Sequence, residues 1–128
     1  MKMLITGGNG KLGRELIKVF SDALYPLSSE LDITKEKDVE SLIKAVQPNV
    51  IIHTAAFTKV QLCEDNKELA YNINVNGTRN LINACTQYAP ECYFIYISTA
   101  CVFDGVKGNF IEEDIPYPKN FYALTKLL

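Results

Sequence analysis

The sequence predicts an α/β fold in which a doubly wound parallel sheet has helices on both faces. Short apolar segments, typical of buried strands, alternate with segments of helical periodicity along the whole chain. The first apolar segment ends in a glycine-rich turn that leads directly into a helical pattern. No internal repeat, low-complexity tract or linker interrupts this order, so we expect the 128 residues to form one domain.

The glycine-rich turn after residues 1–5 predicts a dinucleotide site, because a strand precedes it and a helix follows it. Its glycines follow the spacing G-x-x-G-x-x-G. Gly7 would let the chain turn off the strand, Gly10 would leave room for a pyrophosphate, and Gly13 would let helix and strand approach closely. Free amides at the helix start would donate to that phosphate. The expected cofactor contacts here are Gly7, Gly10, Lys11, Leu12 and Gly13.

Further strands and helices follow the first helix and account for the rest of the chain up to residue 100. Residues 100–120 are rich in glycine and proline and predict a loop. The first helix should face the sheet with Leu12, Leu16, Val19 and Phe20. The predicted strands are residues 1–5, 23–27, 50–53 and 92–97. Two further helices are predicted, over 35–46 with Thr34 as its cap and over 67–87. The second of them follows a predicted loop over 57–66.

Two polar residues lie within predicted core elements. His53 ends a continuous apolar strand, and we interpret it as a structural histidine rather than a catalytic base. Asn74 lies on the inner face of the long helix, where a buried amide needs hydrogen-bond partners. Asn74 is therefore either a satisfied core amide or part of a cofactor-binding active site. The inner face comprises Ala70, Ile73, Asn74, Gly77, Leu81 and Ala84.

The segment after the second predicted strand should decide between NAD and NADP. An acidic residue there would bind the ribose 2′-hydroxyl of NAD, but this chain has Ser28 and Ser29. Serines can accept a 2′-phosphate and also occur in ordinary turns, so both cofactors stay open. Asp32 and Ile33 could contact adenine, or Asp32 could open the next helix. Small residues that would let a cofactor lie against the backbone follow the third strand: Thr54, Ala55 and Ala56.

Composition and charge exclude several classes of protein. The formal net charge of −2 argues against a nucleic-acid partner. No apolar stretch approaches a membrane span, and Met1 leads into the first strand without room for a signal peptide, so we expect a cytoplasmic protein. The cysteines form no C-x-x-C pair, so with a single histidine we expect no metal site but reduced core thiols. They are Cys63, Cys85, Cys92 and Cys101.

Three residues near the end of the chain point to carbonyl reduction. Tyr122 and Lys126 stand four apart, on one face of a helix if this segment is helical. Thr99 follows the last predicted strand, at the edge of the sheet where ligands bind. The Lys126 ammonium and a nicotinamide cation would lower the pKa of Tyr122, which would protonate the carbonyl oxygen as hydride reaches the carbon. Lys126 would also hold the nicotinamide ribose, and Thr99 would donate to the reacting oxygen.

These motifs together carry a family resemblance. TGGNGKLG at 6–13, HTAA at 53–56, NVNGT at 74–78, ST at 98–99 and Y-x-x-x-K at 122–126 resemble the extended short-chain dehydrogenase/reductase superfamily. LDIT at 31–34, PNVII at 48–52, VFDG at 102–105 and EED at 112–114 resemble, within it, the dTDP-4-dehydrorhamnose reductase family. The resemblance implies a Rossmann domain, NADP or NAD as cofactor, and a nucleotide-sugar substrate that is dTDP-linked. It also implies Thr99, Tyr122 and Lys126 as catalytic triad, and a homodimer stays open.

Two departures from that family leave alternatives open. Family members carry an Asp-Tyr pair after the catalytic threonine, whereas this chain has Ala100 and Cys101, a turn closer to nucleotide-sugar epimerases. Family members also continue well beyond the position of Leu128 into a substrate domain. We therefore expect a C-terminally truncated sheet, a loosely held segment over 120–128 and a poor catalyst. The alternatives are a cofactor-binding or regulatory module similar to the regulatory subunit of methionine adenosyltransferase, and a nucleotide-sugar epimerase or dehydratase.

Overall fold

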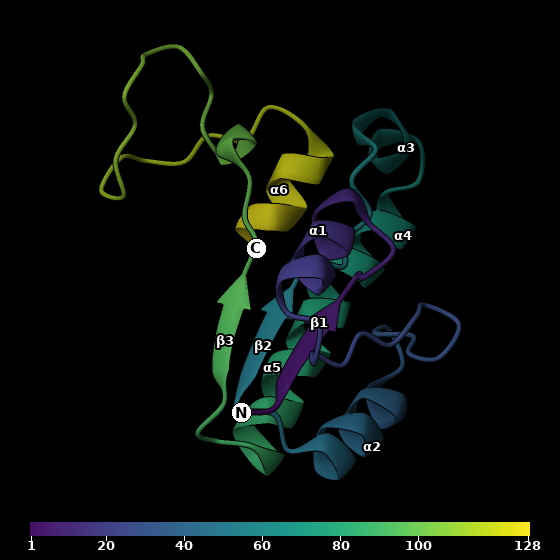
Figure 1. The fold of residues 1–128 in the computed structure, drawn as a ribbon. Helices are drawn as coiled ribbons and strands as arrows, with labels where there is room; N and C mark the ends of the chain where they lie inside the picture. Colours follow the sequence, from purple (N-terminus) through teal and green to yellow (C-terminus); the bar gives the residue numbers. More distant parts are fainter.

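The computed structural model, which describes residues 1–128, contains a three-stranded parallel sheet between helices (Figure 1). The strands β1 (Met3–Thr6), β2 (Val50–His53) and β3 (Tyr93–Tyr96) lie in the order β1-β2-β3. Thr6 pairs with His53, and His53 pairs with Tyr96, so the last residues of the three strands form one row. This row marks the carboxyl edge of the sheet, where ligands of open parallel sheets bind.

The predicted strand over 23–27 is reduced to a single bridge, which corrects the sequence-based expectation. Leu24 pairs in parallel with Leu4, donating to the Met3 carbonyl at 2.9 Å and accepting from the Ile5 amide at 2.8 Å. A longer ladder would need an N–H donor two residues further on, and Pro26 has none. The bridge uses the edge of β1 that β2 leaves free, so the chain winds in both directions from β1.

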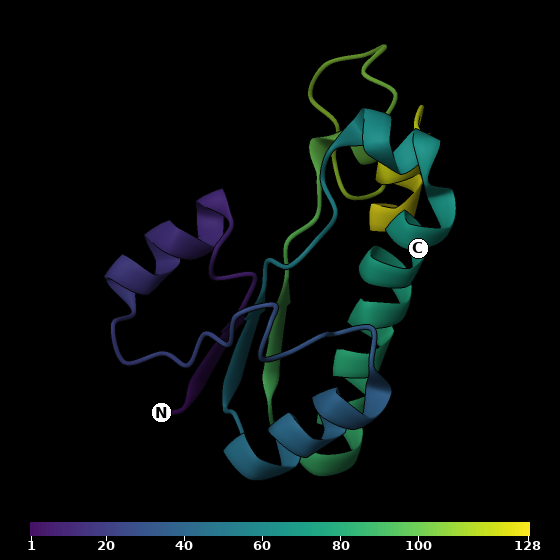
Figure 2. The same cartoon turned by 90° about the vertical axis from the view of Figure 1, so that its right-hand side faces the viewer.

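Helices cover both faces of the sheet, as a doubly wound fold requires. Figure 2 shows α1 (Lys11–Val19) on one face and α2 (Glu36–Val46) with α5 (Thr78–Tyr88) on the other. The larger core lies under α2 and α5. Its fully buried members include Leu4, Val39, Ile43, Ile51 and Leu81.

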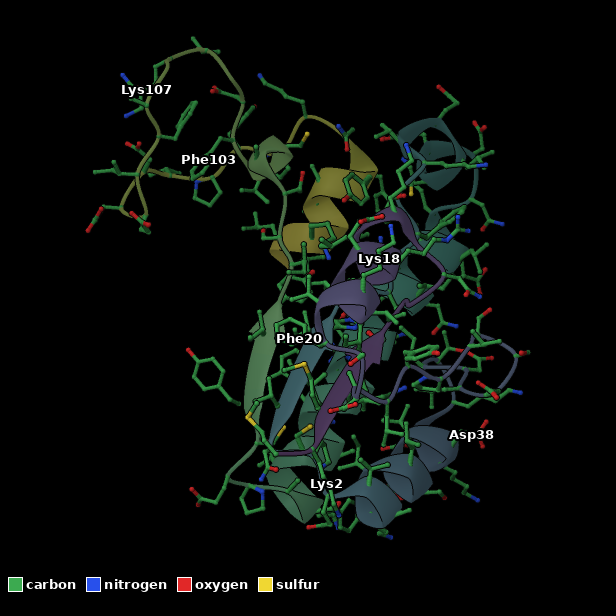
Figure 3. The ribbon with its side chains drawn as sticks, viewed as in Figure 1. Lys2, Lys18, Phe20, Asp38, Phe103 and Lys107 are labelled. Carbon is green, nitrogen blue, oxygen red and sulfur yellow. The ribbon has the colours of Figure 1, made fainter.

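The apolar face predicted for α1 is wrong by part of a turn. Leu16 and Ile17 contact the sheet, whereas Leu12, Val19 and Phe20 are exposed, Val19 to 73%. Figure 3 shows Phe20 at the end of α1. The reason is Gly13, which lies directly against the end of β1. Residues three and four positions after it therefore face the sheet, and Val19 is rotated away.

The long helix predicted over 67–87 is present but not uniform. α4 (Lys67–Tyr71) continues into a π-helix, η1 (Asn72–Gly77), and then into α5. The predicted inner face is buried at every position except the half-buried Ile73. A short helix, α3 (Val60–Asp65), occupies the segment predicted as a loop.

The last helix, α6 (Phe121–Leu127), is held firmly, contrary to the expectation of a loose segment. The Asn120 side chain accepts from the Ala123 amide at 2.8 Å, and Glu64 of α3 accepts from the Phe121 amide at 2.6 Å. Before α6 come the 3₁₀ helix η2 (Ala100–Val102) and a loop that projects from the body, carrying Phe103 and Lys107 (Figure 3).

The surroundings of the cysteines and of β3 also differ from expectation. Cys63 and Cys85 are buried thiols, but Cys92 is half-buried and Cys101 is exposed beside the candidate catalytic residues, so the prediction of four core thiols is wrong. β3 is not fully buried either, since it is an edge strand of the sheet and its first residue, Tyr93, is exposed. No helix combines the length and hydropathy needed to cross a bilayer.

Candidate functional site

A cleft of about 480 Å³ opens at the carboxyl ends of β1 and β2. Its walls are the glycine turn after β1, the segment over 26–34, and the segment that follows β2. Most of the residues predicted to contact a cofactor converge on it, although they come from three separate stretches of sequence. Those lining the cleft are Gly7, Gly10, Ser28, Asp32, Ile33, Thr54, Ala55 and Ala56.

The glycine turn has a geometry that only glycines allow at two positions. Gly7 has a φ of +75°, and a Cβ on it would lie 2.6 Å from the Ala55 amide nitrogen. A Cβ on Gly13 would overlap the Gly7 carbonyl oxygen. A Cβ on Gly10 would meet only that same oxygen, at 3.2 Å, so the backbone at Gly10 is open toward the cleft. This geometry leaves the turn accessible to a ligand that approaches the backbone closely.

The first turn of α1 adjoins the cleft with its amides uncapped. Gly10 is the N-cap residue, in extended conformation, and no side chain accepts from the amides that follow it. The side chains of Lys11 and Leu12 are exposed and do not line the cleft. Their contribution is therefore the backbone N–H groups of Lys11, Leu12 and Gly13, which suit an anionic group at the helix start.

The segment over 28–34 forms the outer wall of the cleft. The amide and hydroxyl of Thr34 both donate to Asp32 Oδ1, at 3.0 and 2.7 Å, so Thr34 does not cap α2 as predicted. The pKa of Asp32 lies below its usual value, chiefly because of the hydrogen bond from the Thr34 hydroxyl. The hydrogen bond from the Thr34 amide and the charge of Lys35 lower it further. Ile33 packs on the η1 backbone at Gly77, where a Cβ would lie 2.7 Å from the Ile33 side chain.

The three predicted catalytic residues lie outside the cleft, near the carboxyl end of β3. Thr99 and Tyr122 are brought close together, because η2, which follows Thr99, packs against α6. Burial nevertheless raises the pKa of Tyr122, and Lys126 is not among the groups that shift it. The expected lowering of this pKa by Lys126 together with a nicotinamide cation concerns the cofactor-bound protein and stays a prediction. Lys126 instead places its Nζ 4.0 Å from the centre of the Tyr96 ring.

The sequence left two roles open for Asn74, and the structure shows it as a core amide whose hydrogen bonds are satisfied. Its Oδ1 accepts from the Phe57 amide at 2.7 Å, and its Nδ2 donates to the Phe57 carbonyl at 3.0 Å and to Thr125 Oγ1 at 2.9 Å. Thr125 lies between Tyr122 and Lys126 on α6, and Phe57 lines the cleft. Asn74 therefore ties the cleft wall to the helix that carries two of the three candidate catalytic residues.

His53 is buried between two threonines, in agreement with the structural role predicted for it. Its Nδ1 lies 2.6 Å from Thr6 Oγ1, and its Nε2 lies 2.9 Å from Thr78 Oγ1. The Thr78 hydroxyl donates to the Asn74 carbonyl, so it accepts from Nε2–H, and Nδ1 accepts from Thr6. Both ring nitrogens are thus satisfied by a neutral imidazole.

Acidification should destabilise the protein through His53. Burial chiefly, and the charge of Lys126, lower its pKa from 6.5 to about 4. Between these values the unfolded chain binds more protons than the folded one, so stability falls as the pH falls through this window. We expect a loss of about 2 kcal/mol at pH 5 relative to pH 7.5, measured by urea denaturation. His53→Gln should remove most of this difference; a variant that keeps the full difference would contradict the assignment.

Sequence reasoning missed several residues that complete the site. Thr6, Phe57 and Thr125 carry the hydrogen bonds described above. Their partners lie far away in the sequence, so no local pattern predicts these bonds, although Thr6 begins the glycine motif. Other residues that were not among the predicted cofactor contacts also line the cleft. The further lining residues include Asn9, Pro26, Leu27, Leu31 and Ile73.

Comparison with known proteins identifies the family. The sequence model of the RmlD substrate binding domain matches residues 1–128. The dTDP-4-dehydrorhamnose reductase of Aggregatibacter actinomycetemcomitans is 40% identical over 131 residues, which cover 98% of this chain and 44% of that protein. Methionine adenosyltransferase 2 subunit beta of Rattus norvegicus is 34% identical over 137 residues, covering 98% of this chain and 40% of that protein.

Solved structures agree with the sequence comparison. The crystal structure of dTDP-4-dehydrorhamnose reductase from Bacillus anthracis in complex with NADP has a TM-score of 0.91 at 35% identity. The aligned region covers 99% of this chain and 47% of the Bacillus anthracis chain. The chain thus spans less than half the length of these three relatives. Since the family model matches from the first residue to the last, this chain belongs to the RmlD substrate binding domain family.

Proposed function

We propose that this chain is the NAD(P)-binding part of an oxidoreductase that reduces the 4-keto group of a nucleotide-linked sugar. The nucleotide that we propose is dTDP. The observation that carries the proposal is the cleft at the carboxyl ends of β1 and β2, where the glycine turn and the uncapped start of α1 meet. The relatives named dTDP-4-dehydrorhamnose reductase, one of them in complex with NADP, support the choice of reaction and cofactor.

The cofactor would lie along three parts of the cleft. Its pyrophosphate would sit on the glycine turn, against the amides of Lys11, Leu12 and Gly13. Its adenosine would lie beside Ser28, Asp32 and Ile33. The small side chains of Thr54, Ala55 and Ala56 would let it continue along the backbone after β2. Because Ser28 lines the cleft where NAD-specific sites have an acid, both NADP and NAD fit.

The group near β3 would carry the proton chemistry. A bound nicotinamide cofactor supplies the hydride. Tyr122 would give its phenolic proton to the carbonyl oxygen, and the raised pKa of Tyr122 keeps that proton in place at neutral pH. Thr99, which lies close to Tyr122, would donate to the same oxygen. Lys126 would bind the nicotinamide ribose, and Asn74 keeps α6 in position through Thr125.

Gly10→Val should abolish cofactor binding, because its branched side chain would occupy the open side of the glycine turn. We expect at least a hundredfold loss of NADPH affinity (about 2.7 kcal/mol) by isothermal titration calorimetry. Gly108→Val is the matched control, since Gly108 lies in the projecting loop with no atom within 4 Å of its added Cβ. Unchanged affinity in Gly10→Val would exclude the proposed pyrophosphate site.

A regulatory module is the second candidate function. The relatives named methionine adenosyltransferase 2 subunit beta favour it, as does the orientation of Lys126 toward Tyr96 instead of Tyr122. Cofactor binding fits both functions, so the discriminating measurement is turnover of a dTDP-4-keto-6-deoxy sugar with NADPH. Turnover that Tyr122→Phe abolishes supports the reductase. The assay uses the natural polypeptide with any residues that it has beyond this chain. NADPH binding without turnover in that protein supports the regulatory module.

A further inference from the structure

Lys126 is a buried cation without an acidic partner. Only 6% of its surface is exposed, and burial lowers its pKa to about 8. The ion pairs of the structure all involve other lysines, at positions 18, 35, 67 and 107. An unpaired ammonium is costly to bury, so something other than a carboxylate must stabilise it where it lies.

Tyr96 contacts both the ammonium group and the backbone of Lys126. The ammonium lies 4.0 Å from the centre of the Tyr96 ring, within the range of a cation–π interaction. The Tyr96 hydroxyl also donates to the Lys126 carbonyl oxygen at 3.5 Å. A comparable contact joins Lys44 to Tyr88 at 4.1 Å, but Lys44 is exposed and has water as an alternative partner. The ring matters more to Lys126, because attraction to an aromatic face is stronger where water is excluded.

The sheet fixes the position of Tyr96. It is the last residue of β3 and pairs in register with His53, whose ring centre lies 6.0 Å from its own. Burial raises the pKa of Tyr96 to about 12, so the phenol stays neutral and attracts the ammonium through its ring face alone. Register and burial together make Tyr96 a fixed support for a side chain on another element.

Few other groups act on the Lys126 charge. His53 on β2 is neutral, and Tyr122 on α6 keeps its proton. Arg79 on α5 borders the same cavity of about 420 Å³ that Lys126 and Tyr96 line, and it is positive. No aspartate or glutamate side chain lines this cavity. The Tyr96 ring is therefore the main local feature that favours the protonated amine.

We propose that Tyr96 is a positioning residue whose ring face holds the Lys126 ammonium in place and keeps it charged. The proposal rests on the proposed function for its consequence, since a charged Lys126 is what would bind the nicotinamide ribose and act on Tyr122. Loss of the ring would leave Lys126 neutral over more of the physiological pH range. Cofactor affinity would then fall at a lower pH than in the unsubstituted chain.

The direct test is the titration of Lys126 in the cofactor-free chain, followed by NMR of ¹³C-labelled lysine side chains. Tyr96→Leu should lower the pKa of Lys126 by about one pH unit, whereas Tyr96→Phe, which keeps the ring, should leave it unchanged. Tyr88→Leu is the matched control at the exposed pair. An equal or higher pKa of Lys126 in Tyr96→Leu would overturn the proposal. If Tyr96→Leu does not fold, a fluorinated phenylalanine at position 96, which weakens the ring quadrupole at nearly constant shape, should lower the pKa in the same direction.

The consequence for binding is measured separately. The loss of NADPH affinity in Tyr96→Leu should grow from pH 6 to pH 8, whereas a purely structural defect would weaken binding equally at both. Because the lysine titration needs no cofactor, its outcome does not depend on whether NADPH binds. Failure of the proposed function would show as absent NADPH binding in the unsubstituted chain, with the Lys126 titration unaffected.

Discussion

Gly13→Ala is expected to lower the free energy of unfolding by at least about 3 kcal/mol. A Cβ on Gly13 would overlap the Gly7 carbonyl oxygen and lie 2.7 Å from the Gly8 Cα. All of these atoms belong to the backbone, so no side chain can move aside to make room. The first helix would have to shift away from β1, and the contacts of Leu16 and Ile17 with the sheet would loosen with it.

Chemical denaturation of Gly13→Ala and Gly10→Ala would measure this effect with a matched control. Gly10 lies in the same turn, but an added Cβ there meets only one atom, at 3.2 Å, so we expect a change below about 1 kcal/mol. The two substitutions add the same methyl group three residues apart. Equal losses of stability in both would show that the close approach at Gly13 does not support the fold.

The parts of the fold that the sequence predicts well are those with a strong local signal. The apolar run over 50–53 coincides with β2, because a strand buried on both faces needs apolar residues at successive positions. The glycine spacing predicts the turn after β1 correctly, because steric exclusion at Gly7 and Gly13 acts over a few residues. Eight predicted cofactor contacts also converge on one cleft, because the carboxyl ends of parallel strands meet at one edge of the sheet.

The parts that the sequence does not predict depend on distant contacts or on single atoms. The pairing of residues 23–27 ends after Leu24, because Pro26 lacks one hydrogen-bond donor. The orientation of α1 follows from how closely Gly13 packs, which periodicity does not encode. The i,i+4 spacing places Tyr122 and Lys126 on one helix, but burial directs the lysine to the Tyr96 ring. We find no local sequence cause for the π-helical turn over 72–77.

Asn74→Leu is expected to lower the free energy of unfolding by about 4 kcal/mol, because it leaves several buried polar groups without a partner. The Phe57 amide loses its acceptor, the Phe57 carbonyl loses a donor, and Thr125 Oγ1 loses the bond that crosses to α6. Leucine has a similar size, so the change removes hydrogen bonds with little change in volume. The loss should be largest at α6, whose amides at 124–127 should exchange with solvent faster than those of α5.

Asn76→Leu is the matched control on the same π-helical turn. Asn76 is only half-buried and bonds to Asn72 and Arg79 at the surface, so its replacement should change stability by less than about 0.5 kcal/mol. Denaturation gives the two stabilities, and hydrogen exchange followed by NMR gives the local effect. Because Phe57 lines the cleft, Asn74→Leu should also weaken NADPH binding, whereas Asn76→Leu should not. Protection of α6 that survives in Asn74→Leu would mean that the packing of α6 against α3, and not the Asn74 amide, holds α6 in place.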